Sequence, residues 1–199
     1  MTQLPPTRYT PQAMKKEHRI TTSRLILRSW RPEDREPYAA MCADPVVMEY
    51  FMRPLLRDES FAEADRIDAV EQKLGFCFWA VEVPGVAPFV GFVGLSSPSF
   101  TAPFTPCFEI GWRLARPHWG SGYATEGARA ALEHGFTKLN APEIVAFTVP
   151  PNQRSRHVME KIGMHRDPAD DFDHPRIPEG HHYQRHVLYR LSRSEWEKR

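Results

Sequence analysis

A short strand, a glycine-rich turn and a helix of small residues follow one another between residues 108 and 138. In the strand, Phe108–Leu114, apolar side chains alternate with others, so one face of it can be buried. Gly120 and Gly122 allow the backbone to turn sharply into the helix. That helix carries a stripe of small or apolar residues, namely Ala124, Ala128, Ala131, Leu132, Gly135 and Phe136. Such a stripe packs closely on a sheet, so the chain must contain a strand–helix–strand unit.

The other segments predict an α+β fold around this unit. The residues before it form a hairpin, because a turn at Pro84-Gly85 joins two apolar strands. Residues 20–199 are predicted to form a single domain, whereas residues 1–19, which contain three prolines, form an N-terminal extension. The predicted strands are 24–28, 76–83, 89–95, 108–114, 144–149 and 186–191, and the predicted helices are one beginning at Pro32 and those at 58–74, 122–138 and 152–162.

Composition excludes several classes of protein. With 199 residues the chain has room for about one domain. Its 26 basic and 25 acidic residues give a net charge of +1, which offers no general attraction to nucleic acid or acidic membranes. No apolar run approaches the roughly 18 residues of a spanning helix, and no signal peptide is evident, so a cytoplasmic protein is expected. The three cysteines, Cys42, Cys77 and Cys107, are expected to be reduced core thiols.

The glycine-rich turn, residues 119–126, can bind a phosphate group. The first amides of a helix have no partner within it, and they point outward with the positive end of the helix dipole. A purely structural turn is the alternative. A P-loop would need Gly-Lys followed by Ser or Thr, and neither pair follows Gly122. A dinucleotide fingerprint would need glycine or alanine where Thr125 stands.

The helix at 152–162 begins at a strong capping residue, Asn152, and ends at Gly163, which suits a left-handed terminus. Ser155 lies one turn after Asn152, where its hydroxyl can reach a ligand held between this helix and the glycine-rich turn. The alternatives are that Asn152 is only a cap and Ser155 only a surface serine.

Four segments in this order resemble the GNAT superfamily of N-acetyltransferases, in particular the branch of the ribosomal-protein N-terminal acetyltransferases. They are Thr22–Arg28, Phe108–Leu114, Trp119–Glu126 and Asn152–Gly163. The resemblance implies a mixed, mostly antiparallel central sheet with helices on both faces, splayed between the strand ending near Leu114 and the strand from Ile144. Acetyl-CoA would lie in that opening. The implied binding residues are Leu114, Trp119, Gly120, Ser121, Gly122, Tyr123, Ala124, Thr125, Asn152 and Ser155.

Two departures from the family pattern affect the implied chemistry. Trp119 stands where the wider superfamily has Gln or Arg, although the phosphate contacts come from main-chain N–H groups. Met159 occupies the place of the tyrosine that protonates the departing thiolate in many members. In the branch resembled here a serine after the asparagine can take that part, which makes Ser155 the candidate acid.

Glu109 is the candidate base, because strand alternation places it on the same face as Gly111, beside space for a pantetheine arm. The alternative is that Glu109 pairs with a basic neighbour. Amides near Leu114 would polarise the thioester carbonyl. If Glu109 is the base, its replacement by glutamine is expected to reduce activity most at low pH.

The resemblance thus implies an acetyl-CoA-dependent N-acetyltransferase that acts by direct attack of a primary amine, on a small molecule or a protein N-terminus, as a monomer or homodimer. A non-catalytic acyl-CoA-binding or sensing protein, or an interaction module, is the alternative. No metal is expected, because the segment ending at His174 and the later His181, His182 and His186 lie in a proline-punctuated loop without ligand spacing. The acidic run in that loop, Asp167, Asp170, Asp171 and Asp173, is either a solvated surface or the border of the acceptor mouth, where it would attract a cationic amine.

Overall fold

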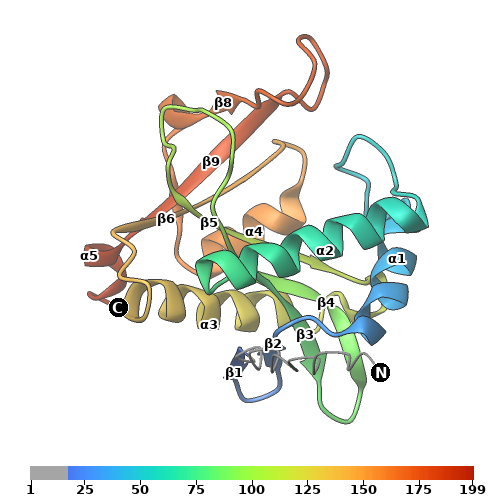
Figure 1. The fold of residues 1–199 in the computed structure, drawn as a ribbon. Coiled ribbons are helices and arrows are strands. Elements are labelled where there is room, and N and C mark those ends of the chain that lie inside the picture. Colours follow the sequence, from blue (N-terminus) through green and yellow to red (C-terminus); the bar gives the residue numbers. More distant parts are fainter. Residues whose placement is uncertain (1–17) are drawn as a thin grey trace, which may run out of the picture.

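The computed structural model describes residues 18–199, so nearly all of the predicted extension 1–19 lies outside the described residues (Figure 1). Within this range the strands form one sheet in the order β1-β2-β3-β4-β5-β6-β9-β7, with β8 paired to β9. The strands are β1 (Arg19–Thr21), β2 (Ile26–Arg28), β3 (Phe78–Val83), β4 (Ala87–Ser96), β5 (Phe108–Leu114), β6 (Glu143–Thr148), β7 (His165–Arg166), β8 (Phe172–Asp173) and β9 (Arg185–Ser192).

Helices cover both faces of this sheet. Helices α3 and α4 lie on one face, where a Cβ on Gly127 would be 3.2 Å from Val93 and one on Gly135 would meet Ile144. Helices α1 and α2 lie on the other, where Arg113 of β5 donates to Tyr38 of α1. The helices are α1 (Arg35–Ala43), α2 (Arg57–Leu74), α3 (Tyr123–Thr137), α4 (Gln153–Lys161) and α5 (Arg193–Trp196), with short 3-10 turns at Pro32–Asp34, Arg116–His118 and Pro168–Asp170.

The sheet opens at its centre, between β5 and β6. These two strands are the parallel pair of an otherwise antiparallel sheet, and they pair only at Phe108 with Ile144 and at Glu109 with Val145. Beyond Glu109, β5 runs on to Leu114 and β6 to Thr148 without pairing to each other. The predicted splay is therefore present, and it begins at Glu109.

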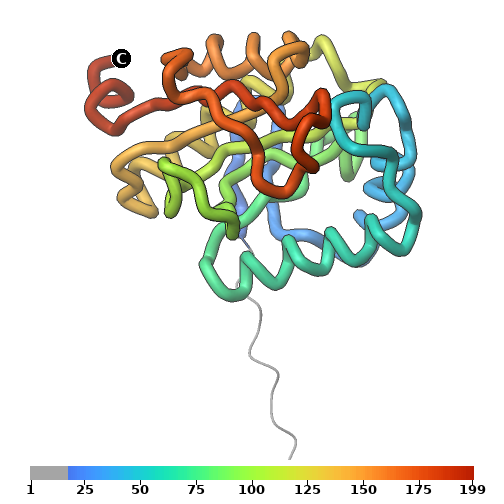
Figure 2. Tube along the Cα trace, turned by 90° about the horizontal axis from the view of Figure 1, so that it is seen from above, coloured from blue at the N-terminus to red at the C-terminus, as the bar shows by residue number. Residues whose placement is uncertain are grey.

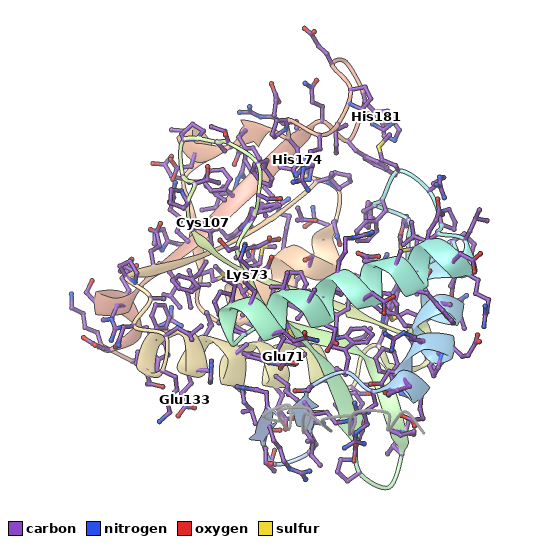
Figure 3. The ribbon with its side chains drawn as sticks, viewed as in Figure 1. Glu71, Lys73, Cys107, Glu133, His174 and His181 are labelled. Carbon is purple, nitrogen blue, oxygen red and sulfur yellow. The ribbon has the colours of Figure 1, made fainter. Side chains whose placement is uncertain are left out.

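Over β6 and β9, the face away from α3 and α4 is covered by irregular chain rather than by a helix. Val145, Phe172 and Leu188 form a small core there with the loop that precedes β5. His174 and Cys107 mark the two covering segments (Figure 3). From above, the chain between β8 and β9 comes close to the segment after α1 (Figure 2), and the Tyr183 hydroxyl donates to the Glu49 carbonyl at 2.6 Å.

The predicted α+β class, the hairpin and the strand–helix–strand unit are all confirmed, the hairpin turning at Gly85 with φ +77°. The short elements β1, β7, β8 and α5 were not predicted, because two to four residues carry no periodic signal. All three cysteines are free; Cys42 and Cys77 are buried in the core as expected, whereas Cys107 is only half-buried. No helix within residues 18–199 has the length and apolar character to cross a membrane.

Candidate active site

A cavity of about 810 Å³ occupies the opening between β5 and β6. Its lining comes from β5, from the turn before α3, from α4, and from the covering segments after α1 and before β9. Every site residue predicted from the sequence lines it except Ser121, whose carbonyl instead accepts from Nη1 of Arg24 at 2.9 Å. The fold therefore brings together residues from 109 to 155 in a single cavity.

The glycine-rich turn presents free backbone donors to this cavity. Gly120 and Gly122 have φ of +75° and +81°, the left-handed conformation that favours glycine. From Gly120 to Thr125, no amide donates to another residue of the described chain, and the first helical bond runs from Glu126 to the Gly122 carbonyl. A Cβ on Gly120 would meet nothing within 4 Å. This end of the cavity can hold a diphosphate on backbone amides.

A network from the segment between β1 and β2 fixes the same glycine-rich turn. Glu126 accepts from the Thr22 hydroxyl at 2.6 Å, the Ser23 hydroxyl at 3.0 Å and the Arg24 backbone at 2.9 Å. Burial raises the pKa of the Glu126 carboxyl, but bonds from Thr22, Arg24 and Ser23 outweigh it, so that pKa is lowered. Arg24 thus bridges Glu126 and the Ser121 carbonyl, and it holds the turn in place.

Backbone donors also line the gap beside β5. The Ala115 amide donates to Val90 of β4, and successive amides of a strand point to opposite sides. The amides of Leu114 and Trp112 therefore point toward the gap. The Leu114 carbonyl accepts from the Trp119 indole at 2.7 Å, which joins the strand end to the glycine-rich turn. A carbonyl group placed in the gap can be polarised there.

Glu109 lies where the two strands separate. It shares the face of Gly111 and Arg113, as predicted, and its side chain is partly exposed to the cavity. Burial raises the pKa of Glu109 to about 8, and no charged partner offsets that effect. Within residues 18–199, Glu109 pairs with no basic side chain, so the alternative of an ion pair is not observed. A carboxyl group with this pKa is suited to accept a proton near neutral pH.

Helix α4 presents its first turn to the cavity. Asn152 caps the helix, because its Oδ1 accepts from the Ser155 amide at 3.2 Å, and its Nδ2 donates to Thr148 at 3.0 Å. The Asn152 side chain is thus occupied by structural bonds. The Ser155 hydroxyl donates to no described residue and lines the cavity. Met159 is 2% exposed and closes the floor below it.

The far wall of the cavity, on the face of the sheet that carries α1 and α2, is aromatic. The ring centroid of Phe147, on β6, lies 6.0 Å from the ring centroids of both His174 and His186. The centroids of the two histidine rings are 5.0 Å apart. Burial, together with His186 and Arg176, lowers the pKa of His174 to about 4, and burial lowers the pKa of His186. Both rings are therefore neutral at pH 7. Sequence reasoning missed this wall, because its members come from distant segments.

The acidic run does not border the cavity. Asp170 pairs with Arg190 at 2.6 Å, Asp171 with Arg166, and Asp173 with Arg185 at 3.5 Å. Asp167 caps the short turn after it by accepting from the Ala169 amide. None of the four lines the cavity, so the hypothesis of an acidic acceptor mouth is wrong, and His174 is the residue of this loop that reaches it.

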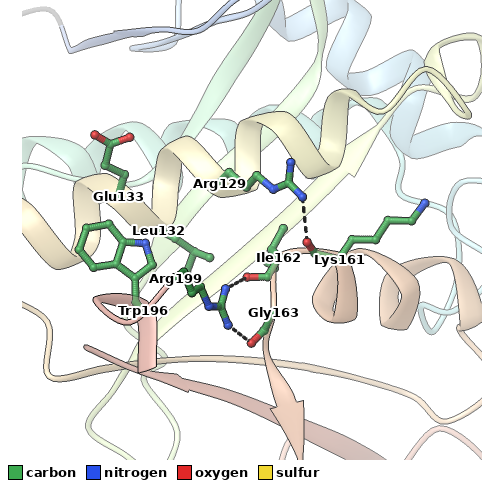
Figure 4. A pocket seen from close by; sticks show the side chains of 8 residues that line it. All are labelled: Arg129, Leu132, Glu133, Lys161, Ile162, Gly163, Trp196 and Arg199. Atoms are coloured by element: carbon green, nitrogen blue, oxygen red, sulfur yellow. Dashed lines mark hydrogen bonds between the residues drawn. The ribbon is translucent and has the colours of Figure 1, made fainter. Parts of the chain in front are cut away.

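A second cavity, of about 570 Å³, lies between α3, the end of α4 and α5 (Figure 4). There Arg129 donates to the Lys161 carbonyl at 3.0 Å, and Arg199 donates to the carbonyls of Ile162 and Gly163. In the described part of the chain, no cluster of three or more His, Cys, Asp or Glu side chains could hold a metal ion.

Known proteins share this sequence pattern and this fold. The family model described as acetyltransferase (GNAT) domain matches residues 24–165. A curated relative, FsC-acetyl coenzyme A-N(2)-transacetylase of Aspergillus fumigatus, is 31% identical over 201 residues, covering 92% of this chain and 80% of the relative. A GNAT-family acetyltransferase structure from Bacillus anthracis superimposes with a TM-score of 0.74 and 26% identity, over 89% of this chain and 100% of that one. Spermidine N-acetyltransferase of Vibrio cholerae, in complex with CoA and spermine, gives a TM-score of 0.68 at 20% identity, over 88% of this chain and 99% of that one.

Proposed function

We propose that this chain, which belongs to the GNAT family of acetyltransferases, transfers the acetyl group of acetyl-CoA to a primary amine at the cavity between β5 and β6. The observation that carries the proposal is the row of free amides from Gly120 to Thr125, which opens onto the same cavity as Glu109 and Ser155. A diphosphate at one end and a base at the other are what direct acetyl transfer from CoA requires.

The geometry of these residues supports a role for each of them. Glu109 takes a proton from the acceptor ammonium, so that the free amine can attack the thioester carbon. The amides of Leu114 and Trp112 polarise the carbonyl oxygen as negative charge develops on it. The new C–N bond forms and the C–S bond breaks, and Ser155 donates a proton to the departing thiolate. The amide nitrogen releases its surplus proton to solvent, from which Ser155 regains one.

The buried Met159 supports a second candidate, a protein that binds acyl-CoA without turnover, because no tyrosine can act as acid at that position. The two candidate functions differ in whether another group can replace the tyrosine as the acid. The Ser155 hydroxyl lines the cavity and has no structural partner in the described chain, so it is available for that role. We favour the enzyme, because that hydroxyl and the raised pKa of Glu109 supply both proton-transfer groups.

The test combines a binding measurement with a turnover measurement. CoA affinity is measured by calorimetric titration, and release of free thiol is measured with a panel of amines. Binding with amine-dependent thiol release supports the enzyme. Binding without release from any amine, peptides included, supports the binding protein, and absence of CoA binding contradicts both. The narrower assignment to the ribosomal-protein N-terminal acetyltransferase branch rests on whether peptide N-termini are the preferred acceptors.

A further inference from the structure

The far wall of the cavity carries few charges. Among the described residues that line the cavity, Glu109 is the only carboxylic acid. The acidic run that could have supplied others is paired to arginines outside it. An acceptor with two or more ammonium groups would therefore find one proton-accepting group and no further counter-charge.

The cationic side chains of the cavity strengthen this restriction. Arg113 lies in the wall at 9% exposure, its guanidinium 4.4 Å from the Phe51 ring centroid and 3.5 Å from Glu63. Lys161 lines the cavity on the α4 side, and Arg154 of α4 pairs with Glu49 at 2.6 Å. Because Glu63 and Glu49 are already paired with arginines, a second ammonium on the acceptor would be desolvated without a free anion beside it.

The remaining surface suits an apolar body. Phe147 stands in a group of rings, with Phe172 at 5.5 Å and His186 at 6.0 Å between centroids. Tyr183 uses its hydroxyl on the Glu49 carbonyl and so offers its ring to the cavity. Because the histidines are uncharged at neutral pH, the wall binds by apolar and aromatic contact rather than by charge.

We infer that the acceptor is a primary amine with a single positive charge, carried on an aromatic or otherwise apolar body, and that polyamines are rejected. The inference rests on the proposed acetyl transfer and names the substrate class of that same cavity. Two sources share this chemistry: a free arylalkylamine, and a peptide whose N-terminal residue is aromatic.

Hexylamine and 1,6-diaminohexane form a matched pair of substrates for the test, because they share a six-carbon chain and differ by one terminal ammonium. With acetyl-CoA and the wild-type chain, we expect kcat/KM for hexylamine to exceed that for the diamine by at least about 100-fold, since the added charge is desolvated without a partner. Among the free amines, phenethylamine should give a higher kcat/KM than hexylamine. The peptide arm compares Phe-Gly amide with Lys-Gly amide, and the phenylalanine peptide should be preferred.

A charge placed in the wall should change this selectivity. Ile177 is a partly exposed wall residue. Ile177→Glu should raise kcat/KM for the diamine by at least about tenfold, whereas Ile177→Gln, whose side chain has the shape of glutamate without its charge, should not. Met52, 54% exposed, offers Met52→Glu as a second variant with little risk to folding. CoA affinity should be unchanged in all three.

The outcomes test the acceptor class separately from the proposed acetyl transfer. If CoA binds and the diamine is acetylated as well as hexylamine, the acceptor class is wrong and the proposed function stands. If neither CoA binding nor thiol release occurs with any amine, the proposed function fails. A preference for either phenethylamine or the phenylalanine peptide supports the inference and identifies the source.

Discussion

The two ends of the cavity present different kinds of binding group. At the α3 end, the binding groups are main-chain amides, and side chains such as Glu126 and Arg24 serve to hold the turn that presents them. At the far wall the binding surface is made of side chains, with Phe147, His174 and His186 in contact with one another. A backbone site tolerates change of side chain, whereas a side-chain wall can change its ligand by substitution. The first end is thus suited to an invariant cosubstrate and the second to a particular acceptor.

The largest effect is expected at the backbone end, from Gly122→Val. A β-branched residue is strained at φ +81°, so the turn must change shape and the amides must move. CoA affinity should fall by at least about 100-fold in a calorimetric titration. Gly85→Val is the matched control, because Gly85 has φ +77° in a hairpin turn away from the cavity and the variant should bind CoA normally. Equal CoA affinity in the two variants would show that the turn does not bind the diphosphate.

Ser155→Ala tests a side chain near the meeting point of the two ends. If its hydroxyl protonates the thiolate, kcat should fall by roughly 100-fold while CoA affinity changes little, because the Asn152 cap uses only the Ser155 amide. Ser155→Thr, which keeps a hydroxyl, should retain much of the activity. Wild-type turnover in the alanine variant would mean that solvent protonates the thiolate directly.

Glu109→Gln should reduce kcat/KM by roughly 10- to 100-fold above pH 8 and progressively less below it. With its pKa raised to about 8, the Glu109 carboxyl is mostly protonated at low pH and serves as a base only when it has lost that proton. The sequence alone led to the opposite expectation, because the acceptor amine is hardest to deprotonate at low pH. The measurement is the ratio of the two pH profiles, in which titration of the acceptor amine cancels. A ratio that does not vary with pH would exclude Glu109 as the base.

The smallest effect is expected from Glu126→Gln, which loosens the support of the turn without touching its amides. Loss of the carboxylate weakens the bonds from Thr22 and Arg24, so CoA affinity should fall by about 3- to 10-fold. Glu133→Gln, on an exposed position of the same helix, is the control. An affinity equal to that of the control would mean that the turn holds its shape without Glu126.

Local features of the sequence predicted the first end of the cavity well. The order strand, two glycines and small-residue helix lies within residues 108–138, and alternation along β5 correctly placed Glu109 with Gly111 and Arg113. Asn152 was correctly expected as a cap. Each of these follows from rules that act over a few residues, which is why the sequence carries them.

The second end could not be predicted, because it depends on contacts between segments far apart in the chain. The partners of Asp170 and Asp173 are arginines of β9, so the apparent acidic run is neutralised only in the folded protein. The network of Arg24 and Glu126 spans 102 residues, and its only sequence signal was an acidic residue in the first turn of a helix. Of the histidines that resemble metal ligands in the sequence, His186 instead joins His174 in a neutral aromatic wall.

A crystal structure with bound CoA tests the proposed CoA site most directly. We expect diphosphate oxygens within hydrogen-bond distance of amides between Gly120 and Thr125, and the thiol end in the gap between Glu109 and Ser155. CoA bound elsewhere, for example in the cavity beside α5, with the amides of the turn unoccupied, would contradict this site.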